Sequence, residues 1–257
     1  RTLAPRIVRG GRIAPGAHGL AMDEAGIIYY SDTYRNEGAA SQVYRLPPPY
    51  NTSQPLEITG TTVSGLYTQG DLLLVTDTGG STVRIYRQGV LEDTLQATQP
   101  WNITRAPEGW VTATYANTVE LLAVGTSPTT LFGGLAFSFD IVYDSDEDAF
   151  WVSESEAKTV RLRARDGQIL REIDAEAASF EVPEGIALDP RGVLWVADTG
   201  ASKIHGFDPG SGELEHTIEV AGMPIMMSND PRDGDVIYSI NGLDSAWWKI
   251  SWEPAED

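Results

Sequence analysis

The sequence contains no cysteine among its 257 residues. This absence excludes disulfide bonds, thiolate metal sites and a cysteine nucleophile. No apolar run approaches the roughly 18 residues that a membrane-spanning helix requires, and no basic segment followed by an apolar one stands at the start. We therefore expect a soluble protein that does not bind membranes. The compartment stays open, and a secreted or periplasmic location is compatible with the sequence.

Basic residues are also scarce. The chain has 18 Lys and Arg residues against 37 Asp and Glu residues, which gives a net charge of −19, and its lysines are Lys158, Lys203 and Lys249. A surface of this charge repels phosphate backbones and anionic lipids. We therefore expect no nucleic-acid partner. The expected partner is a small-molecule ligand or substrate, and the expected state is a monomer.

Turn-forming residues are plentiful, and they separate copies of a repeat. Each copy has a short apolar strand, a turn that contains Asp or Gly, a second apolar or aromatic strand, and usually Asp-Thr. Four copies are clear: HGLAMDEAGIIYYSDT (18–33), SGLYTQGDLLLVTDTGG (64–80), FDIVYDSDEDAFWVSES (139–155) and PEGIALDPRGVLWVADTG (183–200). Two weaker copies are WNITRAPEGWVTATY (101–115) and IMMSNDPRDGDVIYSI (225–240).

The spacing of the repeat predicts the fold. The equivalent positions are Gly19, Gly65, Asn102, Asp140, Gly185 and Met226, with separations of 46, 37, 38, 45 and 41 residues. A unit of about forty residues with four short strands is typical of a propeller blade. We predict an all-β, six-bladed β-propeller of four-stranded antiparallel blades that fills residues 1–257 as one domain. An N-terminal outer strand near Ile7 closes the ring, and helix is expected only near residues 175–179.

Several recurrent residues are interpreted as structural. Trp110, Trp151 and Trp195 are assigned equivalent second-strand positions, where we expect them to pack between blades. The acids that end the second strands are expected to accept hydrogen bonds from backbone amides of the following turn. These acids are Asp32, Asp77, Glu154 and Asp198, and the same role is expected for Asp23 and Asp189 in the first turns. Residues 144–148 resemble the start of a calcium loop but lack its later Gly and Glu.

Candidate functional residues lie where the innermost strands begin. In a propeller these strands run along the central channel, so the residue before each repeat glycine faces one mouth of that channel. These six mouth residues are His18, Ser64, Trp101, Phe139, Glu184 and Ile225. Two of them titrate, one is a hydroxyl, and the three that are large and apolar favour a small organic ligand.

His18 and Glu184 are the candidate catalytic residues. An imidazole at a channel mouth can act as acid, base or metal ligand near neutral pH. The carboxylate of Glu184 can accept a proton, orient His18 or bind a cation. Ser64, Trp101, Phe139 and Ile225 are the candidate substrate-binding residues.

The phrases PEGIALDPRGVLWVADTG and HGLAMDEAGIIYYSDT resemble repeats of NHL propellers and of the related gluconolactonase, or senescence-marker, family. The resemblance implies a divalent cation, often calcium, held in the channel by Glu, Asn and Asp ligands just before the repeat glycine. Of the mouth residues, Glu184 matches such a ligand, and His18 is a possible substitute. Ser64, Trp101, Phe139 and Ile225 depart from the pattern.

Three functions follow as alternatives. The first is a lactone or ester hydrolase of the gluconolactonase type with an atypical site, in which a cation or His18 activates water and Glu184 assists. The second is a non-catalytic NHL-type binding scaffold. The third is a cyclase or lyase of secondary metabolism, in which Trp101, Phe139 and Ile225 shape a small organic substrate.

Overall fold

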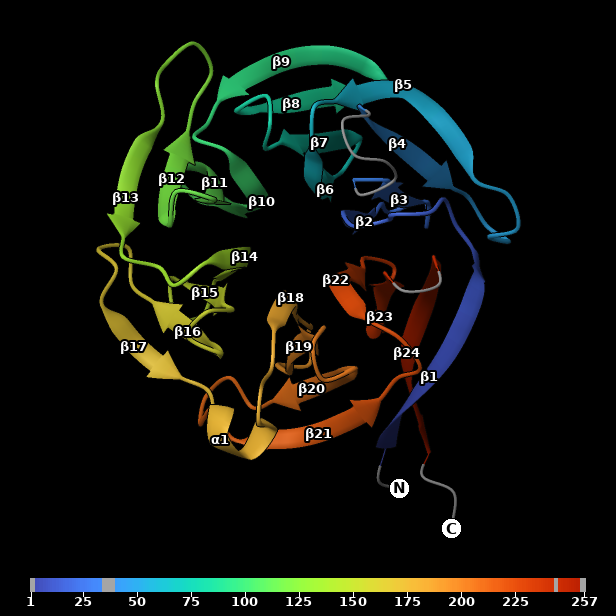
Figure 1. Cartoon of the computed structure of the whole chain (residues 1–257), viewed down its shortest axis with the longest axis vertical. Coiled ribbons are helices and arrows are strands. Elements are labelled where there is room, and N and C mark those ends of the chain that lie inside the picture. Colours follow the sequence, from blue (N-terminus) through green and yellow to red (C-terminus); the bar gives the residue numbers. More distant parts are fainter. Residues whose placement is uncertain (1–2, 34–39, 243–244, 255–257) are drawn as a thin grey trace.

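The structure, a computed structural model, describes residues 3–33, 40–242 and 245–254. Within these residues, β1 to β24 form six sheets of four antiparallel strands, arranged in a ring around a central axis (Figure 1). Each forty-residue repeat corresponds to one sheet, because the blades follow one another in chain order. The predicted six-bladed propeller is therefore confirmed.

Each blade runs from an inner strand beside the axis to an outer strand at the rim. Blades 1 and 2 comprise β2 (Leu20–Met22), β3 (Ile28–Ser31), β4 (Ser41–Leu46) and β5 (Gln54–Gly60), then β6 (Val63–Gln69), β7 (Leu72–Asp77), β8 (Thr82–Arg87) and β9 (Val90–Gln96). Blades 3 and 4 comprise β10 (Pro100–Ala106), β11 (Gly109–Thr114), β12 (Thr118–Leu122) and β13 (Thr129–Gly133), then β14 (Ser138–Asp144), β15 (Ala149–Glu154), β16 (Thr159–Arg163) and β17 (Ile169–Glu172). Blades 5 and 6 comprise β18 (Pro183–Leu188), β19 (Leu194–Asp198), β20 (Lys203–Phe207) and β21 (Leu214–Glu219), then β22 (Pro224–Asp230), β23 (Asp233–Asn241), β24 (Ala246–Pro254) and β1 (Leu3–Arg12).

The ring closes in blade 6. Strand β1, from the start of the chain, pairs with β24, from its end, and Ile7 lies opposite Ile250 (Figure 1). Backbone hydrogen bonds between the two ends of the chain thus fasten the first blade to the last. This confirms the prediction that residues near Ile7 complete the sixth blade.

The core lies between neighbouring blades. Trp151 of blade 4 is fully buried in a cluster with Leu194 and Phe207 of blade 5. Trp195 of blade 5 is equally buried and packs with Met227 of blade 6. These two tryptophans have the predicted role, and each covers the face of its sheet that meets the next blade.

Trp110 does not hold the position that the sequence alignment assigns to it. Counted from the first turn of each blade, Val111 rather than Trp110 corresponds to Trp151. Because side chains alternate between the two faces of a strand, a shift of one residue turns Trp110 toward the preceding blade. There its half-buried ring meets Tyr67 edge-on at 5.7 Å. The assignment of Trp110 as equivalent to Trp151 and Trp195 is therefore wrong.

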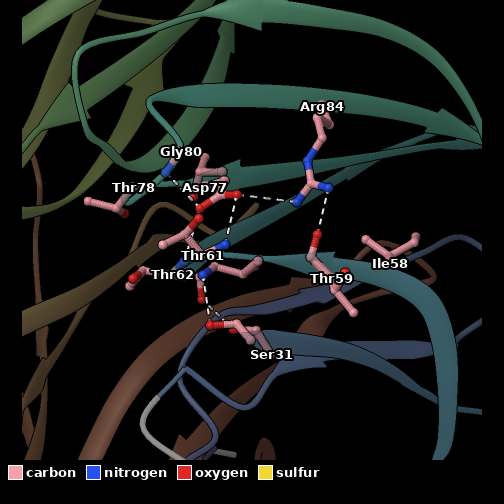
Figure 2. Close-up of polar contacts among 12 residues, drawn as sticks. Ser31, Ile58, Thr59, Thr61, Thr62, Asp77, Thr78, Gly80 and Arg84 are labelled. Atoms are coloured by element: carbon pink, nitrogen blue, oxygen red, sulfur yellow. Dashed lines mark hydrogen bonds and ion pairs between the residues drawn. The ribbon is translucent and has the colours of Figure 1, made fainter. Parts of the chain in front are cut away.

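The acids at the ends of the second strands bind backbone amides, as predicted, and they reach further than the next turn. Asp77 accepts a hydrogen bond from the amide of Gly80 in the following turn at 3.0 Å (Figure 2). It also accepts bonds from the amides of Thr61 and Thr62 at 3.0 Å each, in the segment that leads into its own blade. Arg84 lies 3.7 Å from the same carboxylate. One buried side chain therefore fixes the start of the inner strand.

Asp198 repeats this arrangement and accepts a hydrogen bond from the amide of Ala201 in its following turn. It also accepts hydrogen bonds from the amides of Glu181 at 3.0 Å and Val182 at 2.8 Å, which precede the inner strand β18.

For Glu154 the prediction is wrong: within the described residues it accepts no bond from an amide of the following turn, because its carboxylate is paired with Arg161 and Arg163. Glu154 accepts one from the amide of Ala136 at 3.0 Å, which precedes the inner strand β14. Both acids therefore set the path of the chain toward the channel.

The hydroxyl residue after each acid binds the next blade. Each donates to the carbonyl oxygen of a residue at the start of the next inner strand: Thr33 to Val63, Thr78 to Pro100, Ser155 to Pro183, and Thr199 to Pro224. The Asp-Thr pair of the repeat therefore holds two consecutive inner strands at a fixed spacing.

The acids in the first turns also have the predicted role. Asp23 accepts a hydrogen bond from the amide of Ala25 at 3.0 Å, and Asp189 accepts one from Val193 at 2.9 Å. In the calcium-like segment, Asp144 accepts a hydrogen bond from the indole of Trp151 at 3.0 Å and from amides of its own turn. The carboxylate of Asp144 is thus engaged by its own blade.

One short helix occurs within the described residues, α1 (Ala175–Ala178), where the sequence predicts it. Asp174 caps it by accepting a hydrogen bond from the amide of Ala177 at 3.0 Å. In the part of the chain that the structure describes, no helix has the length and apolar character needed to span a bilayer.

Candidate functional site

The predicted mouth residues lie at the starts of the inner strands, and five of them lie in bulges. The pairing of β6, β10, β14, β18 and β22 with their second strands shifts register where each strand begins. A bulge takes a side chain out of the regular alternation and redirects it. The residues within these shifts are Ser64, Trp101, Phe139, Glu184 and Ile225. His18 stands just before β2 in blade 1.

An aromatic cluster occupies blades 3 and 4 at this mouth. The ring of Trp101 lies 5.1 Å from that of Phe139, 6.4 Å from Phe137 and 6.0 Å from Tyr115, centre to centre. Trp101 is buried, whereas Tyr115 is 48% exposed. The cluster therefore extends from the buried start of the inner strand β10 to the surface.

Tyr115 and Phe137 are missing from the residues predicted from the sequence. Tyr115 follows the second strand of blade 3, where three other copies have the Thr of Asp-Thr. The aromatic residue at the position of that Thr is the sequence feature that could have identified Tyr115. Phe137 lies in the connection that precedes β14. The repeat pattern makes no prediction for residues in that connection.

His18 is buried and neutral at pH 7. Its Nδ1 lies 2.8 Å from the backbone oxygen of Ser64, and because a carbonyl only accepts, Nδ1 carries the proton. Burial lowers the pKa of His18 to about 4, with the Ser64 hydrogen bond acting in the opposite direction. The imidazole also lies 5.9 Å from the ring of Trp101. His18 is therefore part of the aromatic mouth, with Nε2 as its accepting nitrogen.

Ser64 and Ile225 are held by their neighbours. The Ser64 hydroxyl is buried and lies 2.7 Å from the hydroxyl of Thr78. Ile225 is buried in an apolar cluster with Ala17, and Phe139 packs against that cluster from the side. Ile225 and Phe139 therefore belong to one apolar cluster. The hydroxyl of Ser64 has a hydrogen-bonding partner in Thr78.

Glu184 is the mouth residue that changes charge near neutral pH. It is half-buried in the bulge of β18. Burial raises the pKa of Glu184 to about 7, and the negative charge of Asp198 adds to the rise, while a hydrogen bond with Thr199 opposes it. The contacts of His18 lead to Ser64 and Trp101, so His18 and Glu184 are engaged by different neighbours.

A second polar group lies one residue further along the inner strands, and sequence reasoning did not select it. Asn102 donates to Asp140 at 2.6 Å, and Asp140 also accepts from the amides of Ile141 and Ile186 at 2.8 Å each. Burial raises the pKa of Asp140 to about 7 against these three bonds. The sequence feature that could have identified this pair is that Asn102 and Asp140 stand where other blades have the repeat glycine.

The channel widens beyond this pair into a cavity of ≈ 720 Å³. Asn102 and Asp140 lie at its inner end, and exposed turn residues such as Pro190 and Pro231 lie at its outer end. The cavity therefore opens at the mouth where the inner strands finish, opposite the predicted mouth. None of the six mouth residues lines it.

The described residues fit a metal ion poorly. Within residues 3–33, 40–242 and 245–254, no three His, Asp or Glu side chains gather in a group that could hold a metal. Calcium prefers six or more oxygen ligands. Glu184 and His18 supply too few, and Asp140 already accepts three hydrogen bonds. A calcium ion at Glu184 and His18 stays a prediction, which calorimetry with Ca²⁺ would test.

Comparison with known proteins supports the type of repeat. The NHL repeat family matches residues 180–207, which include the fifth inner strand and its neighbours β19 and β20. The resemblance of the sequence to NHL propellers is confirmed over these residues. No curated protein sequence matches the chain significantly.

Solved structures with similar folds include enzymes and a protein of another kind. Luciferin-regenerating enzyme is 14% identical, with a TM-score of 0.71, 96% of this chain covered and 95% of that one. Virginiamycin B lyase from Staphylococcus aureus is 14% identical, with a TM-score of 0.65 and coverage of 97% and 99%. The WD40 propeller of Doa1 is 16% identical, with a TM-score of 0.68 and coverage of 91% and 78%. At these identities the likeness establishes the fold alone.

Proposed function

We propose that this propeller acts on a small, largely apolar organic molecule at the mouth where the inner strands begin, and that Glu184 exchanges a proton with it. The observation that carries the proposal is the half-buried Glu184, with a pKa raised to about 7 by burial, at an aromatic mouth. A carboxyl group with a pKa near the working pH is an effective acid or base.

The reaction that fits best is hydrolysis of a lactone or ester without a metal ion. Deprotonated Glu184 accepts a proton from water, and the hydroxide oxygen adds to the carbonyl carbon. The tetrahedral intermediate then breaks the bond to the leaving oxygen, which takes the proton back from Glu184. His18 is buried and neutral at pH 7, and its imidazole supports the mouth through its hydrogen bond to Ser64 and its contact with the ring of Trp101.

The aromatic cluster sets the expected substrate class. Trp101 is buried against the partly exposed rings of Phe137 and Phe139, and Tyr115 reaches the surface. Such a wall favours a substrate with a planar or apolar body. The net charge of −19 disfavours an anionic one.

Elimination is the second candidate reaction, because the same base serves it. Glu184 would then take a proton from carbon, and no water would enter the product. Virginiamycin B lyase, a protein of similar fold, is a lyase, and a catalytically inactive histidine-to-alanine variant of it has been solved with quinupristin. The isotope content of the product separates the two reactions.

A binding scaffold without chemistry is the third candidate. The observation in its favour is the burial of His18, Trp101 and Ile225, which fill much of the mouth with side chains. Such a scaffold would bind the same apolar molecules, and Glu184→Gln would leave their affinity unchanged.

The test measures turnover of an aryl ester, phenyl acetate, and of an aromatic lactone, dihydrocoumarin, in H₂¹⁸O. We expect Glu184→Gln to lower kcat at least about 10²-fold, as loss of an acid–base group does. Glu181→Gln, an exposed acid three residues earlier, is the control and should have no effect. EDTA should leave the rate unchanged. Activity that survives Glu184→Gln, or that requires a divalent ion, would contradict the proposal.

A further inference from the structure

The cavity of ≈ 720 Å³ at the opposite end of the channel is separate from the site proposed above, because none of the mouth residues lines it. Its size lies within the range of pockets that bind small molecules, about 300–1,000 Å³. The inner strands of five blades each contribute one apolar side chain, from the residue after the repeat position: Leu20, Leu66, Ile103, Ile141 and Met227. The interior therefore suits an apolar body.

Among the described residues that line this cavity, Arg105 alone is basic. It lies on β10 opposite Trp110 of β11, and its guanidinium carbon lies 4.6 Å from the centre of the indole ring. Trp110 in turn meets the ring of Tyr67, on β6 of the preceding blade, edge-on at 5.7 Å. The three side chains form one wall between blades 2 and 3, in which the indole holds the planar guanidinium at the cavity.

The polar atoms of Arg105 and Tyr67 are available to a ligand. Neither side chain makes a hydrogen bond or an ion pair with a residue that the structure describes. The buried polar atoms that lack a partner there include none of Arg105 or Tyr67, so these donors are accessible where the two residues line the cavity. Burial raises the pKa of Tyr67 while the charge of Arg105 opposes the rise, so the phenol keeps its proton at pH 7.

The carboxylates of the lining do not satisfy Arg105. Four of the five are engaged by other groups: Asp140 by Asn102 and two amides, Asp144 by Trp151, Glu147 by Arg171, and Asp189 by Arg191. The fifth, Asp146, is exposed at the rim. The net charge of −19 acts at long range and is screened beyond about 8 Å at physiological salt, whereas a guanidinium in direct contact with an anion is not.

We propose that this cavity is a second ligand site, which binds a small organic carboxylate through the guanidinium of Arg105 and the hydroxyl of Tyr67. The planar fork of N–H groups in Arg105 matches the two oxygens of a carboxylate. Arg105 lies three residues beyond Asn102 on β10, about 10 Å along the strand, so the apolar body of the ligand extends from Arg105 toward the inner end. The site uses no mouth residue and does not depend on the proposed hydrolysis.

The chain contains its own reporters for this site. Met22 and Met227 line the cavity, whereas Met223 is 40% exposed outside the lining. A protein with ¹³C-labelled methionine methyl groups is titrated with sodium hexanoate, 1-hexanol and n-hexylammonium chloride. We expect hexanoate to shift the Met22 and Met227 signals but not that of Met223. Its affinity should exceed that of 1-hexanol at least about tenfold, because hydrogen bonds to charged groups are the stronger ones, and hexylammonium should bind more weakly than hexanoate.

Two variants test the contacts. Arg105→Gln should lower the affinity for hexanoate at least about tenfold and should leave that for 1-hexanol within about 2-fold. Its matched control is Arg45→Gln, because Arg45 is exposed on β4, bonds Gln54 and lies outside the lining, so its loss changes the net charge equally. Tyr67→Phe keeps the ring that packs on Trp110 and should weaken hexanoate about 3- to 10-fold.

Any of three results would overturn the proposal. The first is the absence of shifts at Met22 and Met227 with hexanoate. The second is an affinity for 1-hexanol or hexylammonium that equals or exceeds that for hexanoate, which would make the cavity a general apolar pocket or a cation site. The third is unchanged hexanoate affinity in Arg105→Gln. Glu184→Gln should leave these titrations unchanged, so failure of the proposed hydrolysis would not be mistaken for failure of this site.

Discussion

Asn102 donates a hydrogen bond from Nδ2 to Oδ1 of Asp140 over 2.6 Å, and this bond joins the inner strands of blades 3 and 4 beside the axis. The corresponding residues of blades 1, 2 and 5 are glycines, whose missing side chains let neighbouring strands approach closely. The pair lines the cavity, which none of the six mouth residues lines. Four measurements test how this central region is held together and how it responds to pH.

Asn102→Ala should lower the free energy of unfolding by about 1–3 kcal/mol, because the buried carboxyl group of Asp140 loses one of its three donors. Urea unfolding at pH 7 measures the change. Asn51→Ala, at an exposed position, is the control and should cost less than about 0.5 kcal/mol. Equal effects of the two substitutions would mean that the Asn102–Asp140 bond adds nothing to stability.

Glu184→Gln should change how stability depends on pH. The pKa of Glu184 is raised from 4.5 to about 7, so the folded state holds its proton more tightly than the unfolded state does. Its contribution to stability is present below pH 4.5 and is lost as the pH rises through 7. Glu184→Gln removes that loss, so the variant should gain about 1–3 kcal/mol relative to the parent between pH 4.5 and pH 8.

Urea unfolding of both proteins across that range gives the comparison. His18 acts in the opposite direction, because its lowered pKa adds stability above pH 6.5 that is lost as the pH falls through 4. The contribution of His18 to the free energy of unfolding is the same in the parent and the variant, so it cancels when the two free energies are subtracted. A difference that is constant with pH would show that Glu184 titrates normally.

Asp77→Ala should destabilise the protein by about 2–4 kcal/mol, because three backbone amides lose their acceptor at once. Asp71→Ala in the same blade is the matched control. Asp71 is exposed and its contact is an ion pair with Arg87, so its loss should cost less than about 1 kcal/mol. Thermal and urea unfolding measure both variants. Similar costs would contradict the role given to the acids of the repeat.

Gly185→Ala should destabilise the fold by at least about 3 kcal/mol. A Cβ atom at Gly185 would lie 2.2 Å from the backbone oxygen of Ile225 and 2.7 Å from the Cα of Met226, and backbone atoms of an inner strand cannot move aside easily. Gly89→Ala is the comparison, since Gly89 has a φ of +82° in open space and the cost there is about 1 kcal/mol. Unfolding midpoints of the two variants should therefore differ clearly.

The local sequence pattern predicts much of the architecture. Alternating apolar residues, turn residues and the period of about forty specify a blade, because each blade is built mainly from contacts between strands adjacent in sequence. The same locality explains why Asp77 and Asp198 were correctly assigned to backbone hydrogen bonds. The alignment was wrong for Trp110, because the turns differ in length between blades and a shift of one residue along a strand reverses the face on which a side chain lies.

The site was less accessible to sequence reasoning, because it combines residues from different blades. The sequence by itself determined six blades, closure by the N-terminal strand, and the positions of His18 and Glu184 at one end of the inner strands. Only the tertiary structure decided which side chains meet there, such as Phe137 with Trp101, and that burial moves the pKa of Glu184 to about 7. It also decided that the open cavity lies at the other end. Packing across blades depends on distances and burial, which no single repeat encodes.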